Sequence, residues 1–306
     1  MQPAAPRRLN SLEKTVCLMV LFALLALTIG FAQAAPAAKR KAIRDELARM
    51  QRMHPESVPL RSAVALVLDA QSGETILGKN PASVTPIASI TKLMTAMVTL
   101  DRDLDLQQRI VVSDEDVDQL KGTRSRLQTG SVLTRDELLL IALMASENRA
   151  AAALGRTYPG GLEAFVAAMN AKAGVLGMTD TRFIDATGLS AGNVASARDL
   201  ARLVAAAHRY PLIREYSTRD SASVNAFGRE LAYRNTNGLV RSHGWDIGLS
   251  KTGFINEAGR CLVMQVRVAS RDLIVVLLDS VGKHSRIGDA QRIRKWLETS
   301  VSARRG

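Results

Sequence analysis

Cysteine and histidine are scarce in this chain of 306 residues. One of its two cysteines, Cys17, lies in an apolar leader, which leaves Cys261 alone in the rest of the chain. A single cysteine cannot form an intramolecular disulfide, and this argues against a small extracellular domain held together by disulfides. The four histidines are scattered without the spacing of metal ligands, so we expect neither a metal site nor a cofactor.

Acidic residues are outnumbered, 29 against 41 lysines and arginines, and the formal net charge is +12. The leader contributes Arg7, Arg8 and Lys14 against Glu13, so the rest of the chain carries about +10. This balance favours a polyanionic surface or polymer as a partner, although solubility is an equally good explanation. No nucleic-acid recognition motif is present, and an anionic polymer of the cell envelope fits an exported protein better than nucleic acid does.

The N-terminus has the pattern of an export signal. Basic residues precede an almost uninterrupted apolar run, Val16 to Phe31, and Ala32 to Ala34 has the small-x-small form of a signal-peptidase site. The run is near the lower length limit for crossing a bilayer, so a retained membrane anchor is the alternative. The cleavage site and the Ala/Pro-rich stretch after it favour removal of residues 1–34 as a signal peptide. We therefore predict a periplasmic protein without a stable membrane anchor.

Removal of the leader leaves 272 residues of the 306, enough for one large domain or two intimately packed ones. Hydrophobic residues make up 47% of the chain, so a sizeable core is expected and extensive disorder is not. Residues 35–56 are rich in lysine and arginine, and they predict a basic, partly helical linker that packs loosely or not at all. The folded domain is expected to span residues 57–306.

β-Strand patterns lie at the two ends of this domain. The apolar run 62–68 and residues 74–77 are separated by turn-forming residues, and the runs 261–268 and 273–278 are joined by a short hairpin. A last amphipathic helix follows the second pair of strands. The two pairs together predict one antiparallel sheet built from both ends of the domain.

Helical patterns dominate the middle of the chain. Thr134 and Glu137 are spaced as a reciprocal N-terminal cap and predict a helix over residues 135–144. Further helices are predicted over 162–175 and from a cap at Ser196 onward. Terminal strands and central helices indicate an α+β fold in which the sheet carries an inserted all-helical lobe. The groove between the sheet and this lobe is where a site is expected.

A serine and a lysine are close together at the start of one predicted helix. Pro86 suits the first turn of a helix, and Ser89 and Lys92, three residues apart, would then share one face. A lysine held among apolar residues loses solvation, which lowers its pKa and lets it act as a base toward the serine hydroxyl. Ser-x-x-Lys is common by chance, so this motif alone does not establish an active site.

Two further short motifs follow in the chain. Ser146-Glu147-Asn148 begins 57 residues after Ser89, and Lys251-Thr252-Gly253 begins 103 residues after Asn148, in a predicted strand. Each motif is weak alone, since Ser-x-Asn is common in loops and Lys-Thr-Gly is an ordinary strand end. Found together and in this order, the three motifs make the chain resemble the penicillin-recognising serine enzymes, which share this signature.

Longer segments carry the same resemblance, over roughly residues 57 to 300. The segments 68–74, 86–94, 183–190 and 246–254 are similar to those of the low-molecular-mass D-alanyl-D-alanine peptidases. The stretch from Asn235 to Met264 resembles the D-alanyl-D-alanine endopeptidase branch, which cuts cross-links in peptidoglycan. The resemblance implies a β-lactamase/transpeptidase-like fold, with an antiparallel five-stranded sheet flanked by helices, and a serine peptidase domain over residues 57–306.

The resemblance also implies a role for each residue of the first two motifs. Ser89 would attack the carbonyl of the D-alanyl peptide bond, with Lys92 as the nearby base. Ser146 would pass a proton to the leaving nitrogen. Asn148 would fix the substrate backbone and orient Lys92.

The third motif implies contacts with the substrate. Lys251 would add positive potential to the groove, and Thr252 would offer a hydroxyl to the terminal carboxylate or amide. Gly253 would let the acyl chain lie close to the strand. The backbone N–H groups of Ser89 and Phe254 would hold the oxyanion. The implied partners are the peptide cross-links of peptidoglycan and β-lactam inhibitors.

Three alternatives to an endopeptidase remain open. A D-alanyl-D-alanine carboxypeptidase would use the same motifs, but many carry a β-rich C-terminal domain and an amphipathic anchor, for which residues 301–306 are too few. A class A β-lactamase would add a Glu-x-x-Leu-Asn segment carrying its deacylation base, and residues 149–250 contain none. An inactive wall-binding protein would not need all of the polar motif residues that are present.

Overall fold

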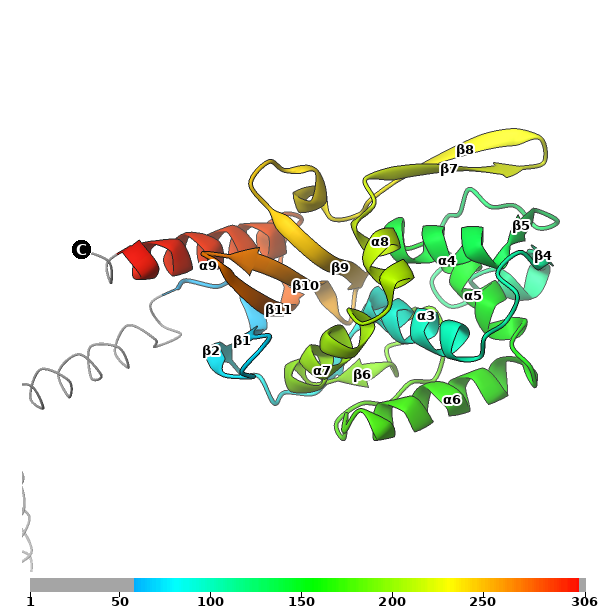
Figure 1. Ribbon diagram of the computed structural model, residues 1–306. Coiled ribbons are helices and arrows are strands. Elements are labelled where there is room, and N and C mark those ends of the chain that lie inside the picture. The colour runs from blue at the N-terminus through cyan, green and yellow to red at the C-terminus, as the bar shows by residue number, and fades with distance from the viewer. Residues whose placement is uncertain (1–57, 303–306) are drawn as a thin grey trace, which may run out of the picture. The chain divides into compact units, whose positions relative to one another are not determined.

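The computed structural model describes residues 58–302 of the chain (Figure 1). The predicted signal peptide, residues 1–34, and the predicted basic linker, residues 35–56, lie outside this range and stay predictions. Within the described range, a sheet made from both ends of the sequence lies beside a mainly helical lobe made from its middle.

The central sheet has five antiparallel strands in the order β2-β1-β11-β10-β9. Their bounds are β1 Ser62–Asp69, β2 Thr75–Lys79, β9 Asp246–Ile255, β10 Gly259–Val268 and β11 Arg271–Ser280. β1 pairs with β11, with Val64 opposite Leu278, so the first and last strands of the sheet region are neighbours. This confirms the prediction of one antiparallel sheet built from both ends of the domain.

The sheet is buried on both faces. Since successive side chains of a strand point to opposite sides, neighbouring residues of one strand belong to two different cores. Val64 belongs to the larger core, which packs against the helical lobe, whereas the next residue, Ala65, belongs to a smaller core. The smaller core is covered by α9 (Ser285–Ser302), whose Ile293 is buried in it. Figure 1 shows α9 lying along the face of the sheet away from the lobe, as the predicted final amphipathic helix requires.

The inserted lobe consists mainly of α-helices. They are α3 Lys92–Asp101, α4 Arg135–Met144, α5 Asn148–Arg156, α6 Gly161–Val175, α7 Ala197–Ala207 and α8 Pro211–Thr218. The predicted cap of α4 is present, because Glu137 N donates to Thr134 Oγ1 at 3.1 Å and Thr134 N donates to a Glu137 carboxylate oxygen at 2.7 Å. These two bonds satisfy backbone groups that a helix start otherwise leaves unpaired, and they confirm where α4 begins.

The lobe also contains short strands that the sequence analysis did not predict. In the described part of the chain they form three two-stranded sheets, β3–β6, β4–β5 and β7–β8. The bounds of these strands and of the 3-10 helices are β3 Thr85–Pro86, η2 Ala88–Thr91, β4 Arg109–Val111, η3 Asp114–Asp116, β5 Val132–Thr134, β6 Val194–Ala195, β7 Ser221–Ala226, β8 Arg229–Arg234 and η4 Gly238–Arg241. Figure 1 shows the β7–β8 hairpin along the top of the lobe.

Pro86 does not lie in the first turn of a helix, so that prediction is wrong. It belongs to β3 and pairs with Val194 of β6, and the N–H of Ile87 is bound to the carbonyl oxygen of Asn193 at 3.0 Å. Because this pairing holds the backbone extended through Pro86, helical geometry begins only afterwards, as a 3-10 turn at Ala88 that continues into α3.

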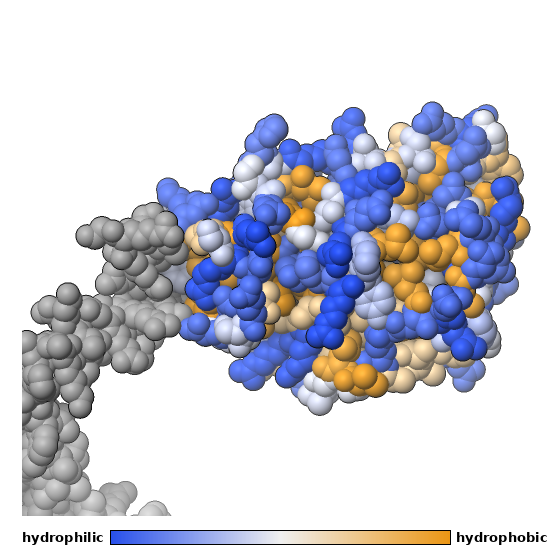
Figure 2. Space-filling view, in the orientation of Figure 1, coloured by the Kyte–Doolittle hydropathy of each residue, from blue (hydrophilic) through white to orange (hydrophobic). Residues whose placement is uncertain are grey.

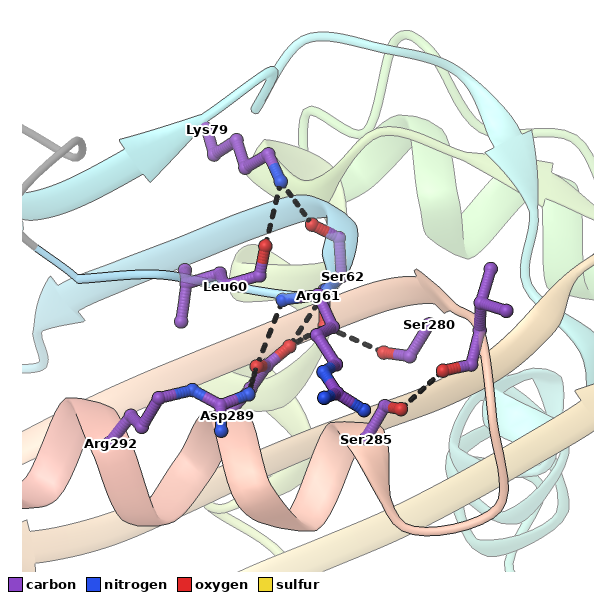
Figure 3. Close-up of polar contacts among 9 residues, drawn as sticks. Leu60, Arg61, Ser62, Lys79, Ser280, Ser285, Asp289 and Arg292 are labelled. Atoms are coloured by element: carbon purple, nitrogen blue, oxygen red, sulfur yellow. Dashed lines mark hydrogen bonds and ion pairs between the residues drawn. The ribbon is translucent and has the colours of Figure 1, made fainter.

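A buried aspartate of α9 fixes this helix to the sheet (Figure 3). Asp289 accepts hydrogen bonds from Arg61 N at 3.0 Å, from Ser62 N at 2.7 Å and from the Ser62 hydroxyl at 2.5 Å. Ser62 Oγ also lies 2.6 Å from Ser280 Oγ at the end of β11, so three elements meet at one carboxylate. Burial alone would raise the pKa of Asp289, but these hydrogen bonds and the Arg292 guanidinium outweigh it and hold the pKa below its usual value.

Hydrophilic side chains cover most of the face that Figure 2 shows, and the apolar ones form separate patches, the larger of them over the helical lobe. Among residues 58–302, no helix combines the length and the apolar character needed to cross a membrane.

Candidate active site

Ser89 and Lys92 share one face of the turn that opens α3, as their three-residue spacing predicts. Ser89 lies in η2, Lys92 is the first residue of α3, and Lys92 Nζ donates to Ser89 Oγ at 2.8 Å. Lys92 is only 1% exposed, which is rare for lysine. Its Nζ has two further partners, Asn148 Oδ1 at 2.8 Å and the carbonyl oxygen of Thr187 at 2.6 Å. A buried amine is thereby held against the serine hydroxyl.

Burial lowers the pKa of Lys92 from 10.5 to about 7. The carboxylates of Asp185 and Glu147 act in the opposite direction but do not outweigh the loss of solvation. The three atoms bonded to Lys92 Nζ are a hydroxyl, an amide oxygen and a carbonyl oxygen, all of them neutral. A lysine with this pKa is about half neutral at pH 7, and the neutral amine can accept a proton from Ser89.

The loop between α4 and α5 brings the second motif to the same place. Ser146 has a φ of 60°, in the left-handed region that serine seldom adopts, and Asn148 is the first residue of α5. Asn148 Nδ2 donates to Thr123 Oγ1 at 3.0 Å, which directs the amide oxygen toward Lys92. This is the geometry expected if Asn148 orients the lysine.

The third motif lies in β9, one of the two edge strands of the sheet. Lys251 Nζ donates to Ser146 Oγ at 2.8 Å, so the second and third motifs meet across the groove. Burial lowers the pKa of Lys251 well below its usual value, and the nearby charge of Lys92 lowers it further. The groove therefore contains two buried serine–lysine contacts rather than one.

Gly253 lies where β9 passes close to the serine of the first motif. A Cβ at this position would be 2.9 Å from the carbonyl oxygen of Ile87 and 3.1 Å from Ser89 N, so a side chain would displace the strand or the turn. Close packing thus explains the glycine, in addition to the expected room for an acyl chain. Phe254 is 49% exposed, with the Arg260 guanidinium 4.4 Å from its ring centre. Because Phe254 directly follows Gly253, its N–H lies in the part of the groove where an oxyanion site shared with Ser89 is expected.

The sequence analysis assigned no role to the loop before β6, although this loop carried part of the family resemblance. Thr187 supplies the carbonyl oxygen that binds the buried lysine, and Asp185 builds the loop by accepting from Thr187 N at 2.6 Å and Gly188 N at 2.7 Å. A Cβ at Gly188, where φ is 80°, would lie 2.0 Å from the carbonyl oxygen of Ala88, so the loop rests directly on η2. The available signal was the spacing Asp185-x-x-Gly188, which is typical of such turns.

Two further side chains support the third motif and were also missed. Thr252 Oγ1 donates to Thr236 Oγ1 at 2.6 Å. Arg286 of α9 donates to the carbonyl oxygen of Gly253 at 3.1 Å, and burial lowers the pKa of its guanidinium. Neither Thr236 nor Arg286 belongs to one of the three short motifs, so only the folded chain shows that they lie at the site.

In the described part of the chain, neither a metal-ligand cluster nor the pocket between α8 and β9 competes with this site. Among residues 58–302, no three His, Cys, Asp or Glu side chains are grouped as metal ligands. A pocket of about 520 Å³ lies between α8 and the start of β9, lined by residues that include His208, Arg214 and Asp246, and it contains none of the motif residues. The chemistry-bearing residues gather instead around Ser89.

The arrangement is suited to acyl transfer through a covalent intermediate. A serine hydroxyl lies against an amine whose pKa is about 7, and a second serine–lysine pair faces it across the groove. Fold and site together are those expected of a serine enzyme of the penicillin-recognising class. Comparison with known proteins agrees: a family model described as D-alanyl-D-alanine carboxypeptidase, peptidase S11, matches residues 50–282.

Relatives with named activities support this family. The D-alanyl-D-alanine endopeptidase of Pseudomonas aeruginosa is 48% identical over 248 residues, which are 80% of this chain and 80% of that protein. The D-alanyl-D-alanine endopeptidase of Escherichia coli is 46% identical over 242 residues, 78% of each chain. This chain belongs to the peptidase S11 family of serine D-alanyl-D-alanine peptidases.

Solved structures have the same fold. The Streptomyces K15 DD-transpeptidase matches with a TM-score of 0.72 at 25% identity, covering 78% of this chain and 97% of that one. A D-alanyl-D-alanine carboxypeptidase from Mycobacterium tuberculosis matches with a TM-score of 0.71 at 27% identity, covering 78% and 92%. The predicted α+β, transpeptidase-like fold is thereby confirmed.

Proposed function

We propose that this protein is an exported, periplasmic endopeptidase that hydrolyses D-alanyl cross-links in peptidoglycan through an acyl-enzyme on Ser89. The observation that carries the proposal is the buried Lys92 amine, with a pKa of about 7 and its Nζ 2.8 Å from Ser89 Oγ. The two relatives named as endopeptidases support cross-links as the substrate. The predicted signal peptide over residues 1–34 supports export, and the net charge of +12 suits an anionic polymer.

Acylation uses both serine–lysine pairs. Ser89 Oγ bonds to the carbonyl carbon of the D-alanyl peptide bond while its proton passes to Lys92 Nζ, and the N–H groups of Ser89 and Phe254 hold the oxyanion. The carbon–nitrogen bond then breaks, and Ser146 donates its hydroxyl proton to the leaving nitrogen. Lys251 Nζ, 2.8 Å from Ser146 Oγ, holds that hydroxyl in place, and the proton that Lys92 took from Ser89 passes to Ser146 to replace the one donated.

Water completes the reaction once Ser146 is protonated again and Lys92 is neutral. The water attacks the ester carbon and gives a proton to Lys92. Ser89 Oγ leaves and recovers that proton. The products are a peptide ending in D-alanine and the free amine of the neighbouring stem peptide.

A carboxypeptidase that releases a terminal D-alanine is the second candidate, because the matching family model carries that description. The acyl transfer is the same in both reactions, and only the leaving group differs. A carboxypeptidase releases one amino acid, whereas an endopeptidase must admit an amine with an attached peptide. The groove of an endopeptidase should therefore be open beyond Lys251 and Thr252.

Digestion of purified cross-linked muropeptide dimers, with the products separated by mass, distinguishes these candidates. We expect dimers to be converted to monomers faster than a monomeric pentapeptide loses D-alanine. Ser89→Ala should be inactive, whereas Ser83→Ala, which changes an exposed serine six positions earlier, should match the wild type. Activity on the pentapeptide that equals or exceeds that on the dimer would make the protein a carboxypeptidase.

Benzylpenicillin gives an independent test of the nucleophile. Intact-protein mass spectrometry should find one long-lived adduct on the wild type and none on Ser89→Ala. The absence of an adduct on the wild type, or labelling of the alanine variant, would show that Ser89 is not the nucleophile.

A further inference from the structure

An ion pair joins a loop of the helical lobe to the sheet next to the third motif. Lys121 lies in the loop that follows η3 in the helical lobe, and Glu257 lies in the turn between β9 and β10, 136 positions further along the chain. The Lys121 ammonium contacts the Glu257 carboxylate, and the two side chains are 30% and 43% exposed. Neither residue belongs to one of the three motifs.

The direction of β9 identifies which part of a substrate passes this ion pair. This step rests on the proposed function, in which Thr252 meets the leaving group and the N–H of Phe254 holds the scissile carbonyl. The strand runs from Thr252 through Phe254 to its end at Ile255, and the turn with Glu257 follows. The acyl donor therefore extends from Phe254 toward Glu257, on the side away from the leaving group.

In the helical lobe, hydrogen bonds connect the backbone of Lys121 to Asn148 of the second motif. Asp118 accepts hydrogen bonds from Lys121 N and Thr123 N, each at 2.9 Å, and from the Thr123 hydroxyl at 2.7 Å. Thr123 Oγ1 in turn accepts an amide N–H of Asn148. The position of Lys121 is thus set by the site, while its partly exposed ammonium remains free to change partners.

The contact between Lys121 and Glu257 is of a kind that exchanges easily. Exposed ion pairs contribute little to stability, because water screens the charges and two long side chains lose freedom. A carboxylate on a substrate that the groove already holds loses less freedom on meeting Lys121 than Glu257 does. Such a carboxylate can therefore displace Glu257.

We propose that Lys121 recognises a carboxylate on the acyl-donor peptide, and that Glu257 is an internal substitute that occupies Lys121 until the donor binds. The preferred donor is then an anionic peptide, with a free carboxylate on the side of the scissile carbonyl away from the leaving group. Lys121 favours such donors, and Glu257 reduces that preference by competing with them.

Penicillins are suitable probes of this part of the site, because their acylamino side chain is attached to the carbon next to the β-lactam carbonyl, where the donor peptide continues in a substrate. Carbenicillin carries a carboxylate in that side chain, ampicillin carries an ammonium, and benzylpenicillin carries no charge. The quantity to measure is the second-order rate constant for acylation of Ser89. The ratio of carbenicillin to benzylpenicillin then isolates the effect of side-chain charge.

The two single variants should change this ratio in opposite directions. Lys121→Gln should lower it about threefold to tenfold, and Glu257→Gln should raise it about threefold, the size expected for partly exposed charges. Exchange of the charges, Lys121→Glu with Glu257→Lys, should reverse the preference toward ampicillin. About 1 M salt should compress all of these differences, because the Debye length then falls to about 3 Å.

A matched control is available at the other end of the same sheet. Arg267→Gln also removes a positive charge from an exposed ion pair, with Asp272, at a position about 25 Å along β10 from the turn that carries Glu257. Its ratio should equal that of the wild type.

An ion pair that only holds the helical lobe against the sheet would behave differently. Its single variants would slow all three penicillins equally and leave the ratio unchanged, and charge exchange would restore the wild-type rates. Either result would overturn the role of Lys121. A wild type that forms no adduct with any penicillin would instead refute the proposed function, whereas adducts whose rates ignore side-chain charge would refute the role of Lys121 alone.

Discussion

Acylation of Ser89 should depend on pH through the buried amine of Lys92. Burial lowers the pKa of that amine from 10.5 to about 7. At 1.36 kcal/mol for each pH unit between the two values, the site disfavours the protonated form by about 5 kcal/mol. The amine can take the serine proton only when it is neutral, so the rate must rise with pH. The neutral fraction is about 0.1 at pH 6, 0.5 at pH 7 and 0.9 at pH 8.

The rate constant for acylation should therefore rise about fivefold from pH 6 to pH 7 and less than twofold above pH 7. Lys92→Arg keeps the positive charge but stays protonated, because a guanidinium does not lose its proton in this range. We expect it to slow acylation about a thousandfold, as removal of a member of a catalytic unit does, and to abolish the rise with pH. Lys172→Arg, which changes a lysine paired with Asp101 at 2.6 Å, should keep both the rate and the profile.

Rapid mixing with a fluorescent penicillin between pH 5.5 and pH 9 provides the measurement, with intact mass confirming that the adduct is on Ser89. A wild-type rate that is flat or falls as pH rises would show that the lysine does not act as a neutral base. Near-normal acylation by Lys92→Arg would mean that Lys92 supplies only positive potential.

Three further predictions concern the framework of the site. Gly188→Ala should slow acylation and destabilise the domain, because its Cβ would lie 2.0 Å from a carbonyl oxygen of the turn that carries the proposed nucleophile. The control is Gly73→Ala: with a φ of 72° and no atom within 4 Å, it should show only the backbone strain of about 1–2 kcal/mol. Asp289→Ala should lower the free energy of urea unfolding at pH 7 by about 3 kcal/mol. Because the pKa of Asp289 in the folded state lies below the unfolded value of 3.8, the difference between variant and wild type should shrink as pH falls through the folded pKa. A difference that stays constant with pH would show that the ionised carboxylate is not what stabilises the fold. Thr123→Val should slow acylation about fivefold to tenfold by freeing the amide of Asn148, and Thr123→Ser should restore the rate; no rescue by serine would show that the hydroxyl is not the cause.

The parts of the fold that the sequence predicts well are those with a local signal. The spacing of Thr134 and Glu137 places the start of α4 at the observed residue, because both partners of the cap lie within one turn. The apolar runs that became β1 and β11 are buried on both faces, so their composition alone indicates strands. The spacing of Ser89 and Lys92 was likewise sufficient to place both side chains on one face.

The missed parts depend on contacts between distant segments. Pro86 suits a helix start locally, but pairing with Val194 decides its conformation. The strands of the β7–β8 hairpin pair only with each other, and two of the three apolar residues that alternate along β7 are alanines, which are poor indicators of a strand. Lys92 is bound by the backbone carbonyl of Thr187. Every residue has such a carbonyl, so the residue type at this position does not predict the contact. Motifs predict which side chains gather at the candidate site, and only the folded chain shows which backbone groups bind them.

The basicity expected of Lys92 depends on where the fold directs two nearby acids. Glu147 lies inside the second motif, yet its carboxylate accepts a hydrogen bond from Ser125 Oγ at 2.7 Å. Asp185 uses its carboxylate on N–H groups of its own loop. A carboxylate hydrogen-bonded to Lys92 would favour the ammonium form and oppose the effect of burial on the pKa, so less of the amine would be neutral at physiological pH. Asn148 presents a neutral oxygen instead. The second motif therefore helps to keep the pKa of Lys92 low in two ways: its amide oxygen binds the amine, and its carboxylate, that of Glu147, is hydrogen-bonded to Ser125 and not to the amine.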